Sequence, residues 1–337
     1  MQLAILGVTG YTGRLVLAEA RRAGLEVRLV GRRREALEEL AAPGEDVRVA
    51  DARDERSLRD AFQGVAVVAS CAGPFLGVGL GPVEAAVRAG AHYLDTTGEQ
   101  AFVRLLHDRV KSDTVVLPAF GFDFVPGDLA ARLAAEKVEG PLDEVIVGYS
   151  VAGTATSRGT RATVAAVMGQ DQVAYAGGKL VPSRFGATTR TMRFPFGDKT
   201  CVEWSGTEPL TVPRHTDVQN VRSYLRAPAA VAQSGRIGKL VSPLLRAVAR
   251  FGSPGPSEES RRKSRFTVVA EATGGGGTGR AVLTGTDVYG LTAVLIVRGA
   301  EALLAGGAHG SGVLAPAEAF DARTLVARLA PLLQIVE

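Results

Sequence analysis

The sequence is poor in the residue types that build metal centres and disulfide frameworks. Its 337 residues include two cysteines and four histidines. Cys71 and Cys201 stand far apart, and neither belongs to a metal-binding or redox spacing. This usage argues against a disulfide-stapled secreted domain, and we expect a protein of the reducing cytoplasm without a bound metal.

Long apolar runs and blocks of one charge are also lacking. The apolar run LTAVLIVRGAEALLAGG is interrupted by Arg298 and Glu301, so it predicts a buried helix and no membrane span. Met1 leads directly into an apolar strand pattern, so we expect no signal peptide. The net charge is only +4, and the densest basic cluster, ESRRKSR at 259–265, has no interleaved aromatic residue. We therefore expect no nucleic-acid partner.

Short β-rich runs alternate with helical stretches from residue 1 to about residue 120. The first strand pattern is LAIL, and the sixth is TVVLPA. Six such alternations predict a parallel sheet with right-handed crossovers, which is a doubly wound Rossmann fold. In such a sheet the ligand crevice lies at the carboxyl ends of the strands.

Beyond Pro126 the pattern changes to strands joined by turn signals. Runs such as DEVIVGYSV and SRFTVVAEATG predict antiparallel strands, Gly274–Gly277 predicts a hairpin turn, and Pro228 to Phe251 is helical in pattern. We therefore expect an α/β chain with a Rossmann domain over 1–125 and an α+β domain over 126–305 that contains a mainly antiparallel sheet. The second domain is expected to bind substrate or form a homodimer, and the helical segment 306–337 to pack back on the first.

The stretch GVTGYTG lies between the first strand and the first helix. Its glycines, Gly7, Gly10 and Gly13, permit a tight turn, close approach of a phosphate and close packing of the helix on the sheet. The free N–H groups of a helix start favour a pyrophosphate. The stretch therefore predicts a dinucleotide site, with Thr9, Tyr11 and Thr12 among its contacts, although a tight turn without ligand would use the same glycines.

The second strand ends in Gly31-Arg32-Arg33-Arg34, where NAD-binding proteins carry an acid for the ribose hydroxyl. Guanidinium groups at this place match a 2′-phosphate, which predicts NADP(H) with Arg32 as the main contact and Arg33 or Arg34 assisting. Asp51, at the end of the third strand, is a candidate neighbour of the adenine or a helix cap.

The loop SCAGPFLGVGLGPVE follows the fourth strand. Small residues and a proline permit close approach of backbone to a cofactor, so we expect Cys71, Ala72, Gly73 and Pro74 on the nicotinamide side and Phe75 against substrate. A plain turn into the next helix would also use these residues.

Three side chains are candidates for proton transfer or for orienting the reactants. Asp95 ends the fifth strand, Asp123 lies just past the sixth, and Tyr149 lies near the end of a strand in the second half. Asp95 could instead cap the following helix, and Asp123 could serve a structural turn before Pro126.

Two further segments are candidates for substrate binding. The polar cluster Thr154, Thr156, Ser157 and Arg158 precedes a helix start, where it could bind a carboxylate, a thioester carbonyl or a phosphate, or merely cap the helix. His309 lies on a glycine-flanked loop and could be structural or reach a ligand.

Several of these segments together resemble the saccharopine dehydrogenase-like family of reductases. The likeness is carried by GVTGYTGRLV with GRRREAL, CAGPF, GPVEAAVRAGAHYLDTTGE and GFDFVPGDLA, and more weakly by AGTATSRGT and GVLAPAEAF. The resemblance implies a Rossmann domain that binds NADP and a second α+β domain that supplies most of the substrate pocket.

Members similar to this sequence reduce different bonds. Saccharopine reductases act on an imine, whereas trans-acting enoyl reductases serve polyketide synthases. We expect an NADPH-dependent enzyme that reduces an activated C=C bond of a small or carrier-bound substrate. The alternatives are an imine reductase, which requires a carboxylate-binding arginine such as Arg158 or Arg161, and a non-catalytic NADP-binding sensor or scaffold.

Overall fold

The computed structural model describes residues 2–153, 156–161, 171–204, 206–228 and 255–337. The chain divides into two compact units, each assembled from separate stretches of sequence. Unit 1 comprises residues 1–97, 102–122 and 289–314. Unit 2 comprises residues 98–101, 123–288 and 315–337.

Unit 1 is built on a seven-stranded parallel sheet in the order β15-β6-β5-β4-β1-β2-β3. The chain winds outward from β1 in one direction and then returns to β4 on its other side, which confirms the doubly wound topology. The strands are β1 (Leu3–Leu6), β2 (Val27–Gly31), β3 (Asp46–Val49), β4 (Val67–Ser70), β5 (His92–Asp95), β6 (Val115–Leu117) and β15 (Gly312–Val313).

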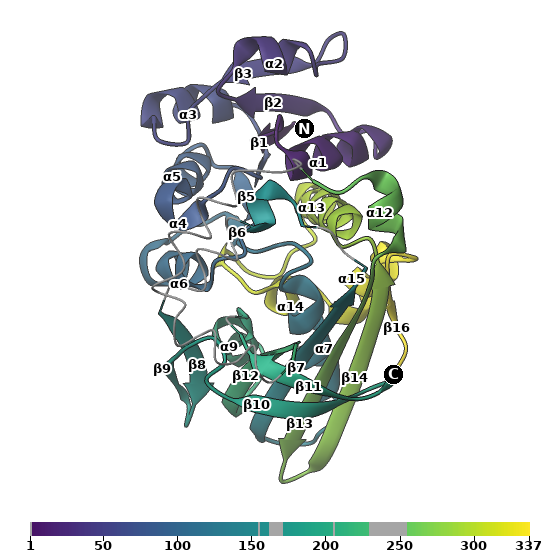
Figure 1. Ribbon diagram of the computed structural model, residues 1–337. Coiled ribbons are helices and arrows are strands. Elements are labelled where there is room, and N and C mark those ends of the chain that lie inside the picture. The colour runs from purple at the N-terminus through teal and green to yellow at the C-terminus, as the bar shows by residue number, and fades with distance from the viewer. Residues whose placement is uncertain (1, 154–155, 162–170, 205, 229–254) are drawn as a thin grey trace. The chain divides into compact units, whose positions relative to one another are not determined.

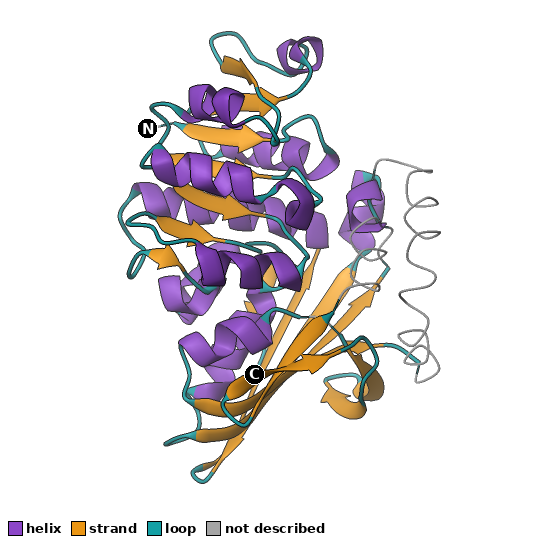
Figure 2. Ribbon diagram, turned by 90° about the vertical axis from the view of Figure 1, so that its left-hand side faces the viewer, coloured by secondary structure: helices purple, strands orange, loops and turns teal. Residues whose placement is uncertain are grey.

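Helices flank the strands of this sheet (Figure 2). They are α1 (Tyr11–Arg22), α2 (Arg34–Glu38), α3 (Glu55–Phe62), α4 (Phe75–Val78), α5 (Leu80–Arg88), α6 (Gln100–Arg109) and α13 (Val288–Leu304). β1 and β4 are buried throughout, as expected for central parallel strands covered on both faces. The predicted buried helix is α13, whose Gly299 lies so close to Phe120 that a Cβ atom there would be 2.7 Å from the ring.

Unit 2 contains a larger, mainly antiparallel sheet (Figure 1). Its main path is β10-β11-β12-β7-β13-β14-β16, and β8 and β9 branch from β12. Only the pair β7 and β12 runs parallel among the described strands of this sheet. The strands are β7 (Leu142–Ala152), β8 (Gln172–Ala176), β9 (Lys179–Ser183), β10 (Thr189–Phe194), β11 (Gly197–Glu203), β12 (Val218–Arg226), β13 (Arg265–Gly274), β14 (Gly277–Thr286) and β16 (Leu333–Ile335).

Helix α7 (Val125–Ala135) packs against β7, β13 and β14 and buries most of its length. Its Pro126 stands at the start of the helix, where the missing N–H group has no partner to lose. The other helices of unit 2 are α9 (Glu208–Thr211), the 3-10 helix η1 (Val212–Arg214), α12 (Glu258–Lys263), α14 (Pro316–Ala319) and α15 (Ala322–Leu329).

The predicted hairpin at Gly274–Gly277 is confirmed, because these two glycines pair at the end of β13 and β14. The strands β8, β9, β12 and β16 were not predicted. Their sequences are short or half exposed, so they carry little of the apolar alternation that marks a strand. The helical pattern from Pro228 to Phe251 lies outside the described residues, apart from Pro228 itself.

The prediction that 306–337 packs on the Rossmann domain is wrong for most of its length. Residues 306–314 lie in unit 1, where β15 extends the parallel sheet. Residues 315–337 lie in unit 2, because β16 pairs with the edge of β14. Conversely, α13 falls within the range expected for the second domain but belongs almost entirely to unit 1.

None of the helices in the described ranges is both long and apolar enough to span a bilayer.

Candidate functional site

The loop between β1 and α1 is shaped by its glycines. Gly7 adopts φ +80°, and a Cβ there would lie 3.1 Å from the backbone nitrogen and the Cβ of Ala72. At Gly13 a Cβ would collide with the carbonyl of Gly7 and lie 2.8 Å from the Cα of Val8. The turn closes through a 2.9 Å hydrogen bond from the Gly10 N–H to the Gly7 carbonyl. These contacts leave no room for side chains between the first strand, the loop and the helix.

The N-terminus of α1 has no capping side chain. Gly10 occupies the N-cap position with extended backbone, and no acidic residue stands in the first turn. The unpaired N–H groups of a helix start and the positive end of its dipole attract an anion such as a pyrophosphate. The glycine loop leaves a space that side chains would fill, and the helix that follows it has no cap. Both features fit the phosphates of a dinucleotide.

Strand β2 delivers a cluster of arginines to the same edge of the sheet. Arg32 and Arg33 follow Gly31, and both are exposed. Within the described residues neither forms an ion pair, whereas Arg34 lies 3.4 Å from Glu38 on α2. The fold thus leaves two guanidinium groups available to a phosphate.

Asp51 lies beside them at the end of β3. Its carboxylate accepts a 2.9 Å hydrogen bond from the Arg53 N–H, which closes a short turn. The residue that caps α3 is Asp54, which accepts from Arg56 and Ser57. The alternative use of Asp51 as a helix cap is therefore wrong, while its contact with an adenine stays a prediction.

The loop after β4 runs next to the glycine loop. The Cys71 N–H donates to the Leu6 carbonyl at 2.8 Å, and Ala72 contacts Gly7. Burial raises the pKa of the Cys71 thiol to about 12, so it stays protonated at neutral pH. Gly73 and Pro74 are exposed and remain candidates for cofactor contact.

Phe75 does not suit the substrate contact predicted for it. Its side chain is 5% exposed, and its ring lies 5.8 Å from that of Phe102 in the core of unit 1. It belongs to α4, whose first residue turns inward because an aromatic ring is stabilised by burial.

Asp95 is fully buried at the carboxyl end of β5, so its side chain has no surface to offer a substrate. Its Oδ1 accepts hydrogen bonds from the Thr97 N–H at 2.9 Å and the Ala119 N–H at 2.8 Å. The predicted catalytic role gives way to that of a buried hydrogen-bond acceptor.

His309 lies away from this edge of the sheet. It precedes β15, which runs parallel to β6, so its loop lies at the amino ends of the strands. The glycine loop, Arg32 and Cys71 all follow the carboxyl ends. The predicted substrate contact of His309 therefore does not join the site in unit 1.

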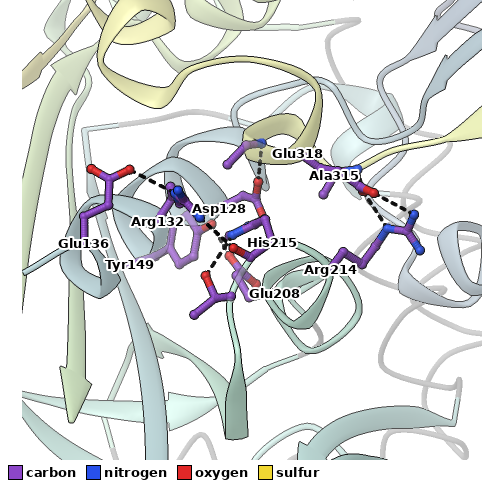
Figure 3. A network of polar contacts seen from close by, with 11 residues as sticks. Asp128, Arg132, Glu136, Tyr149, Glu208, Arg214, His215, Ala315 and Glu318 are labelled. Carbon is purple, nitrogen blue, oxygen red and sulfur yellow. Dashed lines mark hydrogen bonds and ion pairs between the residues drawn. The ribbon is translucent and has the colours of Figure 1, made fainter. Parts of the chain in front are cut away.

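Unit 2 holds the other candidates. Asp123, just before α7, is exposed. Tyr149 is 2% exposed on β7, and its hydroxyl donates to the Glu208 carboxylate. Tyr149 is thus a member of a buried network and has almost no surface for a ligand (Figure 3).

Glu208 is the centre of this network. Its second oxygen accepts a 2.6 Å hydrogen bond from the Ser223 hydroxyl on β12. Gly127 on α7 lies so close that a Cβ there would collide with both Tyr149 and Glu208, and a Cβ at Gly206 would collide with Glu208 and Ser223. Burial raises the pKa of Glu208 to about 7, although the two hydroxyl donors oppose the shift. Burial and the neighbouring Glu208 both raise the pKa of Tyr149.

A second buried acid, Asp128, directly follows Gly127 on α7. Asp128 lies 3.1 Å from the Nε2 of His215 and accepts a 2.8 Å hydrogen bond from the Ala317 N–H (Figure 3). Burial alone would raise the pKa of Asp128, but the charge and hydrogen bond of His215 hold it below its usual range. Asp128 thus ties both His215 and the 315–337 segment to α7 within unit 2.

The polar cluster after β7 caps a helical turn. The Ser157 hydroxyl accepts from the Thr160 N–H at 3.1 Å, and Arg161 donates to the Thr156 carbonyl at 2.6 Å. Thr156 and Arg158 are exposed, whereas Thr154 lies outside the described residues. Ser157 therefore serves as a cap, the simpler of the two uses foreseen for it.

Sequence reasoning missed Glu208, Ser223, Asp128 and His215. Each is a single polar residue, and they become neighbours only when α7, β12 and the 208–215 turn fold together. The one local sign was an acid inside the otherwise uncharged run TEPLTVP.

A family model described as NAD(P)H-binding matches residues 7–114, the stretch that forms most of unit 1. The protein thus contains a nicotinamide-dinucleotide-binding domain.

Several curated proteins are similar over about two fifths of the chain. A trans-acting enoyl reductase of Mycobacterium ulcerans is 34% identical over 163 residues, which cover 42% of this chain and 38% of that protein. A human saccharopine dehydrogenase-like oxidoreductase is 25% identical over 168 residues, covering 42% and 39%. A lipid droplet localized protein of Caenorhabditis elegans is 29% identical over 162 residues, covering 42% and 38%. Each match spans less than half the length of these relatives.

The fold has a neighbour among solved structures. Apo saccharopine dehydrogenase (L-Glu forming) from Saccharomyces cerevisiae aligns over 100% of both chains with a TM-score of 0.62 and 14% identity. The resemblance predicted from the motifs is confirmed: about two fifths of the chain is similar in sequence to saccharopine dehydrogenase-like oxidoreductases, and the fold is similar to that of saccharopine dehydrogenase.

Proposed function

We propose that the protein is an NADPH-dependent reductase that acts on an activated C=C bond, as in an enoyl thioester. The observation that carries this proposal is the end of β2, where Arg32 and Arg33 are exposed without an ion pair in the described structure and no acid occupies the position that would bind a ribose 2′-hydroxyl. The names of the enoyl reductase relatives favour the C=C bond.

Different residues of unit 1 would bind different parts of the cofactor. Gly7, Gly10, Gly13 and the start of α1 would hold the pyrophosphate, with Thr9, Tyr11 and Thr12 beside it. Arg32 and Arg33 would bind the 2′-phosphate by charge-assisted hydrogen bonds. Cys71 to Pro74 would lie along the nicotinamide half. When bound, NADPH supplies the hydride.

Reduction of an enoyl thioester also requires a proton at the carbon next to the carbonyl. Asp123 is the candidate donor because the residue is exposed and desolvation by the surrounding protein raises the pKa of its carboxyl group to about 6, whereas Tyr149 and Asp95 are buried. Thr156 and Arg158 would bind the carbonyl or the carrier-linked end of the substrate. A cytoplasmic location and a homodimer stay predictions.

The test is the oxidation of NADPH and NADH by purified protein in the presence of enoyl thioesters, cyclic imines and ketones. Turnover of enoyl thioesters with NADPH supports the proposal. Turnover of imines alone would overturn the choice of bond, and tight NADPH binding without turnover of any class would favour a sensor. The Asp123→Asn variant should lose most of the turnover while binding NADPH normally.

A further inference from the structure

Two non-glycine residues have a positive φ among the described part of the chain, Ala119 at +57° and Asp287 at +50°. Ala119 follows β6 at the carboxyl edge of the parallel sheet and is 4% exposed. A side chain in the left-handed region is strained, and such residues persist where the surrounding structure imposes them, often at functional sites.

Asp95 imposes the conformation of Ala119. Its side-chain Oδ1 accepts the Ala119 N–H at 2.8 Å, and its main-chain carbonyl accepts the Phe120 N–H at 2.7 Å. The same Oδ1 accepts the Thr97 N–H, so one buried carboxylate ties the end of β5 to the segment after β6.

The far end of this segment is also fixed within unit 1. The Phe122 N–H donates to the Thr292 hydroxyl of α13 at 3.1 Å, and Phe120 packs against Gly299 of the same helix. Residues 118–122 are thus a short stretch of backbone held at both ends.

The position of this stretch relates it to the cofactor. The strand order changes direction between β1 and β4, and a dinucleotide lies across that point outside the carboxyl ends of the strands. With Arg32 at the end of β2 assigned to the 2′-phosphate, the nicotinamide half extends toward β4, β5 and β6.

We propose that Asp95 is a positioning residue, which holds Ala119 in its left-handed conformation and so fixes the buried residues 118–122 as the support beneath the nicotinamide half of the site. This inference rests on the proposed function. Asp95 does not touch the cofactor in this account, and it acts through Ala119 and Phe120.

The test compares NADPH with 2′-phospho-ADP-ribose, which lacks the nicotinamide, by calorimetric titration. Asp95→Ala should weaken the binding of NADPH about tenfold, the equivalent of a lost buried hydrogen bond. It should change the affinity for 2′-phospho-ADP-ribose by less than about twofold. Asp95→Asn, which keeps the Oδ1 acceptor, should bind both as the wild type does. Asp95→Ala combined with Ala119→Gly should recover most of the NADPH affinity, because glycine adopts the left-handed conformation without strain.

An equal loss for both ligands, or no recovery in the double variant, would overturn the proposal. If Asp95→Ala does not fold, Ala119→Val tests the same conformation with Asp95 intact, since a β-branched residue disfavours it. That variant should lose NADPH affinity selectively, and an equal or absent effect would contradict the assignment. Failure of the wild type to bind NADPH would instead contradict the proposed function.

Discussion

At the scale of single residues, two ionisable side chains differ in their exposure to solvent and in their partners. Arg32 is exposed at the edge of the parallel sheet and has no ion pair in the described structure. Glu208 is fully buried, and its described partners are the hydroxyls of Tyr149 and Ser223. An exposed cation without an ion pair is available to a ligand, whereas burial of an acid beside neutral hydroxyl donors favours its neutral form.

Replacing Arg32 by alanine should weaken NADPH binding by about tenfold or more and leave NADH binding within about twofold, because only NADPH carries the 2′-phosphate. Arg104→Ala is the matched control, since Arg104 is an exposed arginine on α6 whose guanidinium lies near Asp108. The measurement is the dissociation constant of each variant for NADPH and for NADH. Equal losses of affinity for NADPH and NADH would show that Arg32 does not contact the 2′-phosphate.

The raised pKa of Glu208 predicts a specific dependence of stability on pH. Its folded-state pKa of about 7 lies above the ordinary glutamate pKa of 4.5, so the unfolded chain releases this proton first as the pH rises. Stability from Glu208 is therefore full below pH 4.5 and is lost as the pH rises to 7, by at most about 3 kcal/mol. Glu208→Gln removes the titration.

Denaturant unfolding of the wild type and Glu208→Gln at pH 5 and pH 7.5 measures this difference. The wild type should lose stability relative to the variant at the higher pH. A difference between the two proteins that is the same at both pH values would show that Glu208 does not titrate in this range.

At the scale of elements, local patterns were reliable where one strand or turn carried its own signal. The glycine loop follows an apolar strand and precedes a helix, so its position and its spacing could both be read from the sequence. The quadruple glycine identified a hairpin for the same reason. The C-terminal strand β16 was not predicted, because three residues are too few to show an alternation of apolar and polar side chains. Its position depends on pairing with the edge of β14.

The packing of α7 on β7 predicts that Gly127 cannot carry a side chain. Gly127→Ala should destabilise the protein by about 1–3 kcal/mol, because the new methyl group collides with Tyr149 and Glu208. Gly275→Ala is the control, since a Cβ there meets nothing within 4 Å. Thermal and denaturant unfolding of both variants provide the comparison, and two equally stable variants would contradict the close packing of α7.

At the scale of the whole molecule, the sequence supported the two kinds of sheet better than the division of the chain between them. The alternation of strands and helices predicts a parallel sheet wherever it occurs, but it does not say that α13 joins unit 1 or that 315–337 joins unit 2. Those assignments depend on contacts between segments far apart in the sequence. The same limit hid the role of Asp95, because its partner Ala119 lies 24 residues away.

The central claim is that the carboxyl edge of the parallel sheet binds NADP(H). Calorimetric titration of the intact protein with NADPH and with NADH tests it most directly. We predict one NADPH per chain, bound at least about tenfold more tightly than NADH, as expected for charge-assisted contacts to a 2′-phosphate. Equal affinity for the two nucleotides would contradict the role of the arginines, and binding of neither would contradict the assignment of the glycine loop.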